Sequence, residues 1–457
     1  MMIRRLFVAN RGEIALRILA GAQRLGIETV LGVSDADLDS VPARLADRCV
    51  RIGPAPAAHS YLDIGAVVAA ASGAAADALH PGYGFLSESA ALARACEAAG
   101  LIFVGPTAAT LAALGDKLMA RQHAVAAGVP VVPGAAVASL AECEHLVRTL
   151  GWPILIKAVG GGGGRGLRRV EAPAQLAGQL ELASSEANAA FGDPRVYVER
   201  YVADGRHIEV QLLGDETDVV HLGTRDCSVQ RRYQKLVEEA PAPGLTAALE
   251  RRITDAAVAL GRRLRYRGAG TVEFLIDGRR DEFYFLEVNA RIQVEHPVTE
   301  MISGCDLVAE QLAIAAGSAL RITQQRLSMR GHAIECRINA EDVEHGLRPS
   351  PGRVSRAVFP AGEGIRVDTH IEAGSAVPPF YDSLLAKIIV RAADRAAAIE
   401  RMAAALALCD ITGVAVNTSL LARILADAQF RDGAVDTGYL ERLLAADDRA
   451  SARSAAG

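Results

Sequence analysis

The segment Glu282–Pro297 reads EFYFLEVNARIQVEHP, and its two halves carry different patterns. Up to position 289, aromatic and aliphatic residues surround isolated polar ones, which is typical of a strand. From there on, polar and apolar residues alternate, so an extended chain would place Asn289, Arg291, Gln293 and Glu295 on one face. Two amides, a guanidinium and a carboxylate on one face suit a small planar oxyanion, with Glu295 placed as a base.

A second strand pattern precedes this segment and completes a β-hairpin. The run GTVEFLID at 270–277 alternates like a strand, and DGRRD at 277–281 favours a turn. Glu273 and Glu287 would then stand on neighbouring strands among apolar residues, where two carboxylates repel each other unless a cation neutralises them. Mg²⁺ prefers such ligands together with substrate phosphates. The alternative, two solvent-facing glutamates, conflicts with their apolar neighbours.

A glycine-rich stretch lies upstream, at 154–166, and reads ILIKAVGGGGGRG. Consecutive glycines let backbone N–H groups approach phosphate oxygens without a Cβ in the way. The spacing is not that of a P-loop, because Lys157 precedes the glycines. A flexible linker is the alternative, but the apolar strand before the glycines favours a hairpin loop that covers phosphates.

Lysine is scarce in this chain, with four lysines against forty-five arginines. Because arginine is the default cation, each lysine is a candidate for placing a compact ammonium on one phosphate or carboxylate oxygen. Lys117 follows a Gly-Asp pair, Lys157 precedes the glycines, and Lys235 ends the run RRYQK. Lys387 lies in an apolar, strand-like run without a motif, so a mere remnant of an arginine-rich genome is an equal alternative there. We therefore expect arginine to be tolerated better at Lys387 than at Lys235.

Further polar side chains lie in strand patterns elsewhere. His207, Glu209 and Gln211 share one face, but a zinc site is disfavoured because no further His or Cys lies at ligand spacing nearby. Arg337 lies at the end of a strand pattern, where a surface ion pair is the alternative to a functional role. His296 falls opposite the polar face of the opening segment, which indicates a structural role.

Length, charge and cysteine content bound the class of protein. A chain of 457 residues exceeds one ordinary core, so roughly two to four subdomains are expected. The net charge of −5 argues against nucleic acid as the main partner. Seven cysteines without a C-x-x-C pair indicate free thiols in a reducing compartment. The sequence shows neither a signal peptide nor an apolar run long enough to span a membrane.

The chain divides into regions of different pattern. Residues 6–105 alternate between strand and helix, which predicts a parallel sheet with functional loops at its carboxyl edge. No G-x-G-x-x-G follows the first strand, so this is not a dinucleotide-binding fingerprint. Residues 107–128 predict two Ala-rich helices between domains, and residues 131–202 a compact unit that suits a mobile lid. Strand patterns dominate 203–320 and begin again at 331.

Five motifs together resemble the biotin carboxylase component of biotin-dependent carboxylases, a member of the ATP-grasp superfamily. They are ANRGEIA (9–15), HPGYGFLSE (80–88), the glycine loop, QRRYQKLVEEAPAP (230–243) and RIQVEHPVTE (291–300). The likeness runs from Ile3 to about Leu443. It implies an α/β fold, α+β in places, of the ATP-grasp type. The expected parts are a Rossmann-like N-terminal domain (1–112), a helical linker (113–130), a lid with the glycine loop (131–202), a catalytic core (203–330), a C-terminal domain (331–443) and a disordered tail (444–457).

The resemblance also implies a role for each matching residue. ATP would be bound by Lys117, Lys157, Gly162, Gly163, Gly164, Gly166, Glu199, Val202, His207, Gln230 and Leu275. Two Mg²⁺ or Mn²⁺ ions would be held by Glu273, Glu287 and Asn289. Bicarbonate would be bound by Lys235, Arg291, Gln293 and Val294. The catalytic set would be Glu295 as the base, with Arg291, Lys235, and Arg337 as the group that stabilises enolate-like biotin.

The implied reaction carboxylates biotin N1 through carboxyphosphate, as the first half-reaction of an acyl-CoA carboxylase of the acetyl-CoA carboxylase type. Biotin would be a substrate on a separate carrier, because no lysine has Met-Lys-Met-like surroundings and the chain ends before any biotinyl or carboxyltransferase domain. The implied partners are a biotin carboxyl carrier protein, carboxyltransferase subunits and a second copy in a cytoplasmic homodimer, with neither nucleic acid nor membrane.

Two alternatives stand beside this interpretation: another ATP-grasp ligase that forms an acyl-phosphate, and a catalytically silent ATP-binding regulatory subunit. The presence of all the charged residues expected at the active site argues against a catalytically silent subunit. The choice of acyl-CoA or keto acid, biosynthetic or catabolic, would lie in the carboxyltransferase subunit. Three residues depart from the usual family pattern: Tyr233 stands for His or Asn, Ala290 for a small hydroxyl residue, and Val159 for Ser.

Overall fold

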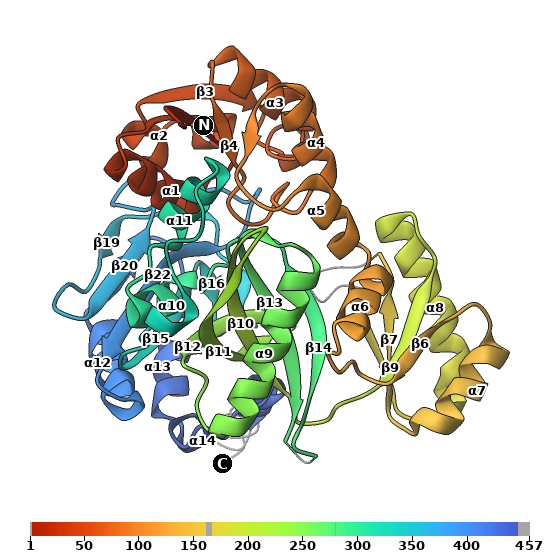
Figure 1. Ribbon diagram of the computed structural model, residues 1–457. Helices are drawn as coiled ribbons and strands as arrows, with labels where there is room; N and C mark the ends of the chain where they lie inside the picture. Colours follow the sequence, from red (N-terminus) through yellow and green to blue (C-terminus); the bar gives the residue numbers. More distant parts are fainter. Residues whose placement is uncertain (1, 161–166, 279, 447–457) are drawn as a thin grey trace.

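The computed structural model describes residues 2–160, 167–278 and 280–446 (Figure 1). Four residues expected to contact ATP, Gly162, Gly163, Gly164 and Gly166, therefore lie outside the described residues. Residues 447–457 of the expected tail lie outside the described residues too, whereas residues 444–446 belong to a helix, which continues past the boundary predicted at 443. Among the helices described, none combines the length and hydrophobicity that a membrane span requires.

The N-terminal domain is built on a parallel sheet, as predicted. Its strand order is β3-β2-β1-β4-β5. The strands are β1 (Arg5–Val8), β2 (Glu28–Ser34), β3 (Arg48–Gly53), β4 (Ala78–His80) and β5 (Ile102–Phe103). Helices α1 (Gly12–Arg24), α2 (Val41–Leu45), α3 (Ile64–Gly73) and α4 (Ala90–Ala98) alternate with them. β3 is an edge strand that is mostly exposed, so it lacks the apolar pattern of a buried strand.

Two helices connect this domain to the lid, as the Ala-rich pattern predicted. They are α5 (Ala108–Gly115) and α6 (Lys117–Ala126). Each begins with a side-chain cap, since Thr107 accepts from the N–H of Thr110 and Asp116 from the N–H groups of Leu118 and Met119. The break between the helices places Lys117 in the first turn of α6, next to the lid.

The lid is a small four-stranded sheet with its own hydrophobic core. Its order is β6-β9-β7-β8. The elements are β6 (Gly134–Val137), α7 (Leu140–Leu150), β7 (Ile154–Ala158), β8 (Leu167–Val170), α8 (Pro173–Phe191) and β9 (Val196–Arg200). Figure 1 shows it at the right of the molecule, separate from the main body. The antiparallel pairing of β7 with β8 confirms the predicted hairpin on either side of the glycines.

An antiparallel sheet of eight strands forms the body of the molecule. Its strands come from both the central and the C-terminal regions of the chain, in the order β14-β13-β10-β11-β12-β15-β22-β20. Its strands are β10 (Arg206–Asp215), β11 (Val219–Arg231), β12 (Gln234–Ala240), β13 (Arg267–Asp277), β14 (Glu282–Asn289), β15 (His332–Asn339), β20 (Ile365–Thr369) and β22 (Leu384–Ala392). The β13–β14 hairpin is as predicted. Because β12 pairs with β15, the sheet continues across the boundary expected at residue 330.

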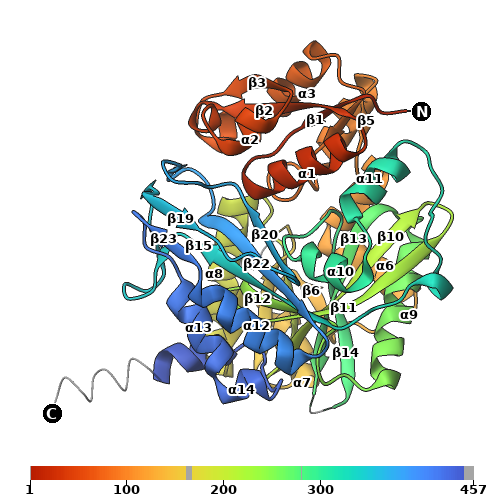
Figure 2. The same cartoon turned by 90° about the vertical axis from the view of Figure 1, so that its left-hand side faces the viewer.

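Helices of the central and C-terminal regions pack around this sheet. They are α9 (Ala247–Arg263), α10 (His296–Ser303), α11 (Leu307–Ala315), α12 (Arg395–Ala407), α13 (Thr418–Ala426) and α14 (Ala428–Arg431). Figure 2 shows α12, α13 and α14 together on one side of the C-terminal strands, and α1 between the N-terminal sheet and the large sheet. Six strands of two or three residues, β16 (Glu341–Asp342), β17 (Arg348–Pro349), β18 (Gly352–Arg353), β19 (Arg356–Val358), β21 (Ala376–Val377) and β23 (Asp410–Thr412), form short pairs at the edge.

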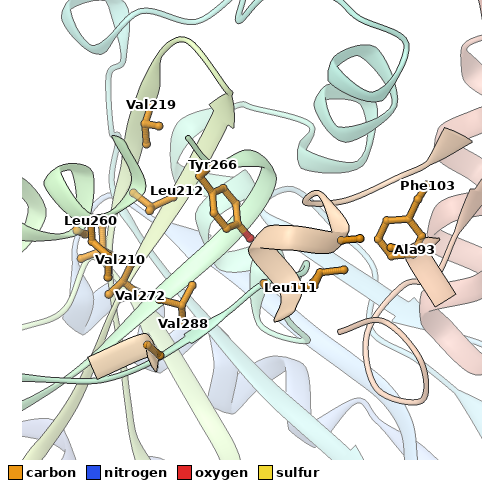
Figure 3. Close-up of a cluster of buried hydrophobic side chains, with 14 of the residues drawn as sticks. Ala93, Phe103, Leu111, Val210, Leu212, Val219, Leu260, Tyr266, Val272 and Val288 are labelled. Atoms are coloured by element: carbon orange, nitrogen blue, oxygen red, sulfur yellow. The ribbon is translucent and has the colours of Figure 1, made fainter. Parts of the chain in front are cut away.

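One hydrophobic cluster joins the N-terminal domain to the large sheet (Figure 3). Phe103 of β5 and Leu111 of α5 belong to it, together with Val210 and Val272 from the sheet. Tyr266 is fully buried within it, and its hydroxyl donates to the carbonyl of Ala269 at 3.1 Å. Burying such side chains contributes about 1.5–3 kcal/mol each. This shared core lets loops of both parts contribute to one site.

The segment after β14 corrects one prediction. Residues 290–295 are not a continuing strand: the chain turns, and Glu295 is the N-cap of α10. Pro297 in the first turn favours a helix start, because its fixed φ suits a helix and its missing N–H has no partner to lose there. The polar side chains of this segment therefore converge through a turn, and not through alternation along one strand.

Candidate active site

Three carboxylates stand in one row across the large sheet. Glu209 on β10 pairs with Glu273 on β13, which pairs in turn with Glu287 on β14. Neighbouring strands lie about 4.8 Å apart, so these like charges repel each other unless cations lie between them. The sequence analysis predicted the Glu273–Glu287 pair, and the structure adds Glu209, which it places with no exposed surface.

Lys235 of β12 supplies one of these cations. Its Nζ donates to Glu209, to Glu273 Oε1 at 3.1 Å and to Glu295 Oε1 at 2.8 Å. Burial alone would lower the pKa of this lysine, but the three carboxylates outweigh burial and hold the pKa well above its usual value. Lys235 thus makes the point contacts with carboxylate oxygens that its scarcity predicted.

Glu295 is held between two cations at the start of α10. Its Oε1 accepts from Lys235 and its Oε2 accepts from Nη2 of Arg337 at 2.8 Å. Burial would raise the pKa of Glu295, but Lys235 and Arg337 outweigh it and leave the pKa below its usual value. The side chain is therefore an ionised carboxylate at neutral pH, the form a general base needs.

Arg337 belongs to the site and is not a surface ion pair. Besides Glu295, it contacts Glu238, whose Oε1 accepts from Nε at 2.6 Å. Glu238 is fully buried, and burial raises its pKa to about 7 although Arg337 acts in the opposite direction. A guanidinium with donors beyond these two contacts can still serve an incoming oxyanion.

Arg225 is a site residue that the sequence analysis missed. It is fully buried on β11 and donates to Glu209 Oε2 at 2.9 and 3.0 Å and to Gln293 Oε1 at 2.5 Å. Because Arg225 occupies the oxygen of the Gln293 amide, the Nε2 group of Gln293 points to Glu273 at 2.9 Å. The local sequence offered no signal for this role, because β11 reads VVHLGTRDCSVQR and mixes polar with apolar residues.

Arg291 is anchored from two directions. Its Nη2 donates to Asn289 Oδ1 at 2.6 Å, and its Nε donates to Glu88 at 3.1 Å. Glu88 comes from the N-terminal domain and also accepts from the N–H of Ala290 at 2.9 Å. Glu88 lies in the motif HPGYGFLSE but received no role from the sequence. The N-terminal domain thus holds the turn that carries the site.

The predicted metal ligands have the chemistry of a hard-cation site. Asn289 donates to Glu273 Oε1 at 2.8 Å, which places its amide beside the Glu273–Glu287 pair. Burial and the neighbouring charge of Glu273 raise the pKa of Glu287, although Lys117 acts in the opposite direction. Two carboxylates and an amide oxygen fit Mg²⁺ or Mn²⁺, and a divalent cation would relieve this repulsion.

The structure changes the argument about zinc. His207 and Glu209 gain Glu273 as a neighbour through strand pairing, so a third candidate ligand lies beside them in space although none does in sequence. However, the Nε2 atom of His207 lies 3.1 Å from Glu273. Burial would lower the pKa of His207, but Glu273 outweighs burial and raises it, which favours an ion pair over a metal ligand.

The predicted nucleotide residues lie where the lid faces the sheet. Lys157 on β7 lies 2.6 Å from Glu199 on β9, so this pair is within the lid. Lys117 begins α6, and burial together with the charge of Lys157 lowers the pKa of Lys117 while Glu287 raises it. Gln230 contacts His207 Nδ1 at 3.3 Å at the floor of the site. Two lysines near one another suit a polyanionic ligand.

A small apolar cluster lies at the junction of the lid and the large sheet. Val202 and Leu275 pack with Val132 and Tyr284 at the junction of lid and sheet. Two of the residues expected to bind ATP, Val202 and Leu275, are therefore in one cluster. An apolar cluster at such a junction suits the flat, apolar faces of a nucleotide base.

Sequence models of three families match almost the whole chain. The biotin carboxylase N-terminal domain matches residues 2–111 and the biotin carboxylase C-terminal domain matches residues 335–442. The ATP-binding domain of the carbamoyl-phosphate synthase L chain matches residues 116–323.

Curated relatives are similar to this chain over nearly its full length. The biotin carboxylase of Nostoc sp. is 48% identical over 444 residues, which cover 96% of this chain and 99% of the relative. That of Pseudomonas aeruginosa is 48% identical over 451 residues, covering 98% and 100%.

Solved structures give the same answer for the fold. The biotin carboxylase from Campylobacter jejuni, in complex with β,γ-ATP, has a TM-score of 0.94 at 42% identity and covers 96% of this chain and 99% of its own. The biotin carboxylase domain dimer of the 2-oxoglutarate carboxylase from Hydrogenobacter thermophilus, in complex with MgADP, ADP and bicarbonate, has a TM-score of 0.93 at 42% identity, covering 97% and 98%. The chain belongs to the biotin carboxylase family of ATP-dependent ligases, with the ATP-grasp fold.

Proposed function

We propose that this chain uses ATP and bicarbonate to carboxylate N1 of biotin on a separate carrier protein. The observation that supports this most is the contact of Lys235 and Arg337 with the two oxygens of Glu295, beside the row of carboxylates on β10, β13 and β14. An ionised base between two cations suits a small oxyanion that must lose a proton.

The first chemical step is the activation of bicarbonate. Bicarbonate binds near Lys235, Arg291, Gln293 and the backbone of Val294, and the Glu295 carboxylate removes its proton. The resulting oxygen attacks the γ-phosphorus of ATP, which gives carboxyphosphate and ADP. Lys117 and Lys157 offset charge on the phosphates, and a divalent cation held by Glu273, Glu287 and Asn289 would supply further charge compensation.

The second step transfers the carboxyl group. Carboxyphosphate breaks down to CO₂ and phosphate, and the phosphate accepts the proton of biotin N1. Arg337 stabilises the negative charge that then develops on the ureido oxygen, and N1 attacks CO₂. Arg337 is fixed by Glu238 and Glu295 before the substrate arrives, so little reorganisation is needed.

The proposed partners are a biotin carboxyl carrier protein, carboxyltransferase subunits and a second copy of this chain. The dimer of the Hydrogenobacter thermophilus domain supports the last of these. Similar structures come from a 2-oxoglutarate carboxylase and from pyruvate carboxylases, so the proposal stops at biotin and does not choose the final acceptor. Buried thiols such as Cys96, Cys227 and Cys336 suit a reducing, cytoplasmic location.

A phosphate-release assay with free biotin tests the proposal. Rapid ATP cleavage should require bicarbonate, biotin and a divalent cation together, and omission of any one should leave only a slow background. ATP cleavage that is unchanged without bicarbonate would refute the proposed reaction, whereas dependence on another amine acceptor would indicate a different ligase.

A further inference from the structure

Lys387 is fully buried in β22, although no sequence motif surrounds it. It is paired across the sheet with Arg337 on β15 on one side and with Asp368 on β20 on the other. Cross-strand partners point to the same face of a sheet. The lysine therefore stands on the face of the sheet that carries Arg337 and the site.

The ammonium of Lys387 reaches the site directly. Its Nζ donates to the carbonyl oxygen of Val294 at 2.8 Å, and lies 3.1 Å from Glu13 of α1 and 3.8 Å from Asp368. Burial would lower the pKa of Lys387, but the carboxylates of Glu13 and Glu335 outweigh burial and raise the pKa. A charged donor thus bonds the backbone of the residue just before Glu295.

Two neighbouring peptide groups of this turn are fixed by hydrogen bonds to their carbonyl oxygens. The carbonyl of Gln293 accepts from Nδ1 of His296 at 2.7 Å, and the next carbonyl, that of Val294, accepts from Lys387. The C=O and N–H of a planar peptide point in opposite directions. Holding the two carbonyls therefore also sets the directions of the N–H groups of Val294 and Glu295.

We propose that Lys387 is a positioning residue of the bicarbonate site, which holds the Val294–Glu295 peptide so that the Glu295 base faces the substrate. This inference rests on the proposed function. It links three parts of the chain, because β22 lies in the C-terminal region, Val294 in the turn after β14 and Glu13 in the N-terminal domain. Misplacing a reacting group by about 1 Å can cost roughly a hundredfold in rate.

The test uses the double variant Lys387→Met and Glu13→Gln in the full-length enzyme. Methionine retains the volume of lysine without the donor, and glutamine avoids an unpaired buried carboxylate while it still accepts from the Tyr83 hydroxyl. Asp368 keeps its contact with Arg366 at 2.7 Å. We expect the KM for bicarbonate in biotin-dependent ATP cleavage to rise about tenfold or more, with the KM for ATP changed less than about twofold.

Arg395→Met is the matched control. Arg395 is a cation of the same region that bonds a buried carboxylate, Glu239, at 2.7 Å and the carbonyl oxygens of Phe430 and Arg431. This variant should lose thermal stability without a change in the bicarbonate KM. A third variant, Lys387→Arg, keeps the positive charge but replaces the ammonium with a bulkier guanidinium. It should also raise the KM for bicarbonate.

The outcomes separate this inference from the proposed function. If the wild-type enzyme shows no bicarbonate-dependent cleavage, the function itself fails. If the wild type is active and the folded Lys387 variants keep the wild-type bicarbonate KM, the function stands and the positioning role is overturned. Failure of all the Lys387 variants to fold would also overturn the proposal, because the lysine would then serve the domain junction.

Discussion

At the scale of the residue, the lysines carry the most information. Lys235 contacts three carboxylates with one nitrogen. A compact ammonium can do this, whereas the wide, planar guanidinium of arginine cannot place one nitrogen among three carboxylates. Lys387 donates to a carbonyl and forms ion pairs with two carboxylates from a fully buried position. The expectation that Lys387 would tolerate arginine better than Lys235 rested on the lack of a motif, and its burial removes that basis.

Lys235→Arg should reduce bicarbonate-dependent turnover about tenfold or more, while ATP affinity changes much less. The guanidinium would have to spread among Glu209, Glu273 and Glu295, and would crowd the space for bicarbonate. Steady-state kinetics with bicarbonate and ATP varied separately would measure both effects. Near wild-type turnover would mean that charge alone suffices at this position.

Glu295→Gln should lower bicarbonate-dependent ATP cleavage by roughly 10²-fold or more, as is typical for loss of a general base. Glutamine retains the shape of the side chain and can still accept from Lys235 or Arg337. Nucleotide binding, followed by fluorescence titration, should therefore be preserved. Loss of ATP binding in parallel with activity would instead indicate a collapsed site.

At the scale of the element, the β13–β14 hairpin brings two carboxylates together by its register alone. Glu273 and Glu287 are direct cross-strand partners. Glu273→Gln and Glu287→Gln should each raise the Mg²⁺ concentration needed for half-maximal activity about tenfold or more, since each removes one formal charge from the ligands. The check is a Mg²⁺ titration at saturating ATP, with Glu282→Gln at the far end of the same hairpin as the control. An unchanged titration for both variants would exclude this pair as ligands.

The turn that follows the hairpin shows how an element can depend on its surroundings. Local alternation predicted a strand over residues 290–295, but Pro297 starts a helix and the chain must bend toward it. The turn is then fixed by Glu88 at one end and Lys387 at the other. These anchors come from opposite ends of the sequence, so no local pattern could show them.

At the scale of the whole molecule, buried histidines make the fold sensitive to acid. Burial lowers the pKa of His80 to about 3, and burial with the charge of Lys387 lowers that of His296 well below its usual value. Both are fully buried. The unfolded chain binds these protons below pH 6.5 while the folded chain does not, so the free energy of unfolding falls as the pH drops from about 6.5 toward 4.

His80→Asn should flatten this dependence. Asparagine can still accept from the N–H of Gly82, which donates to His80 Nδ1 at 3.0 Å. Removing one titrating group should reduce the slope of unfolding free energy by at most about 1.4 kcal/mol per pH unit between pH 6.5 and 4. Urea unfolding at several pH values would measure it, with exposed His345 replaced by Asn as the control. Equal slopes for wild type and His80→Asn would contradict the assignment.

The sequence by itself determined the parts that short-range patterns encode. Strand and helix alternation gave the parallel N-terminal sheet, the Ala-rich run gave α5 and α6, and the hairpin brought Glu273 and Glu287 together. The motifs also indicated Glu295, the proposed base, and Lys235, a cation that contacts it. These features depend on periodicity and turn residues within a few tens of positions, which a sequence displays directly.

Only the tertiary structure decided what surrounds that base. Arg225 and Gln293 lie 68 positions apart, Val294 and Lys387 lie 93 apart, and Glu88 and Ala290 lie 202 apart. Each contact arises because strands from distant segments share one sheet, or because one hydrophobic core joins two domains. Burial sets the energy of these charges, and burial is a property of the assembled fold and not of any local pattern.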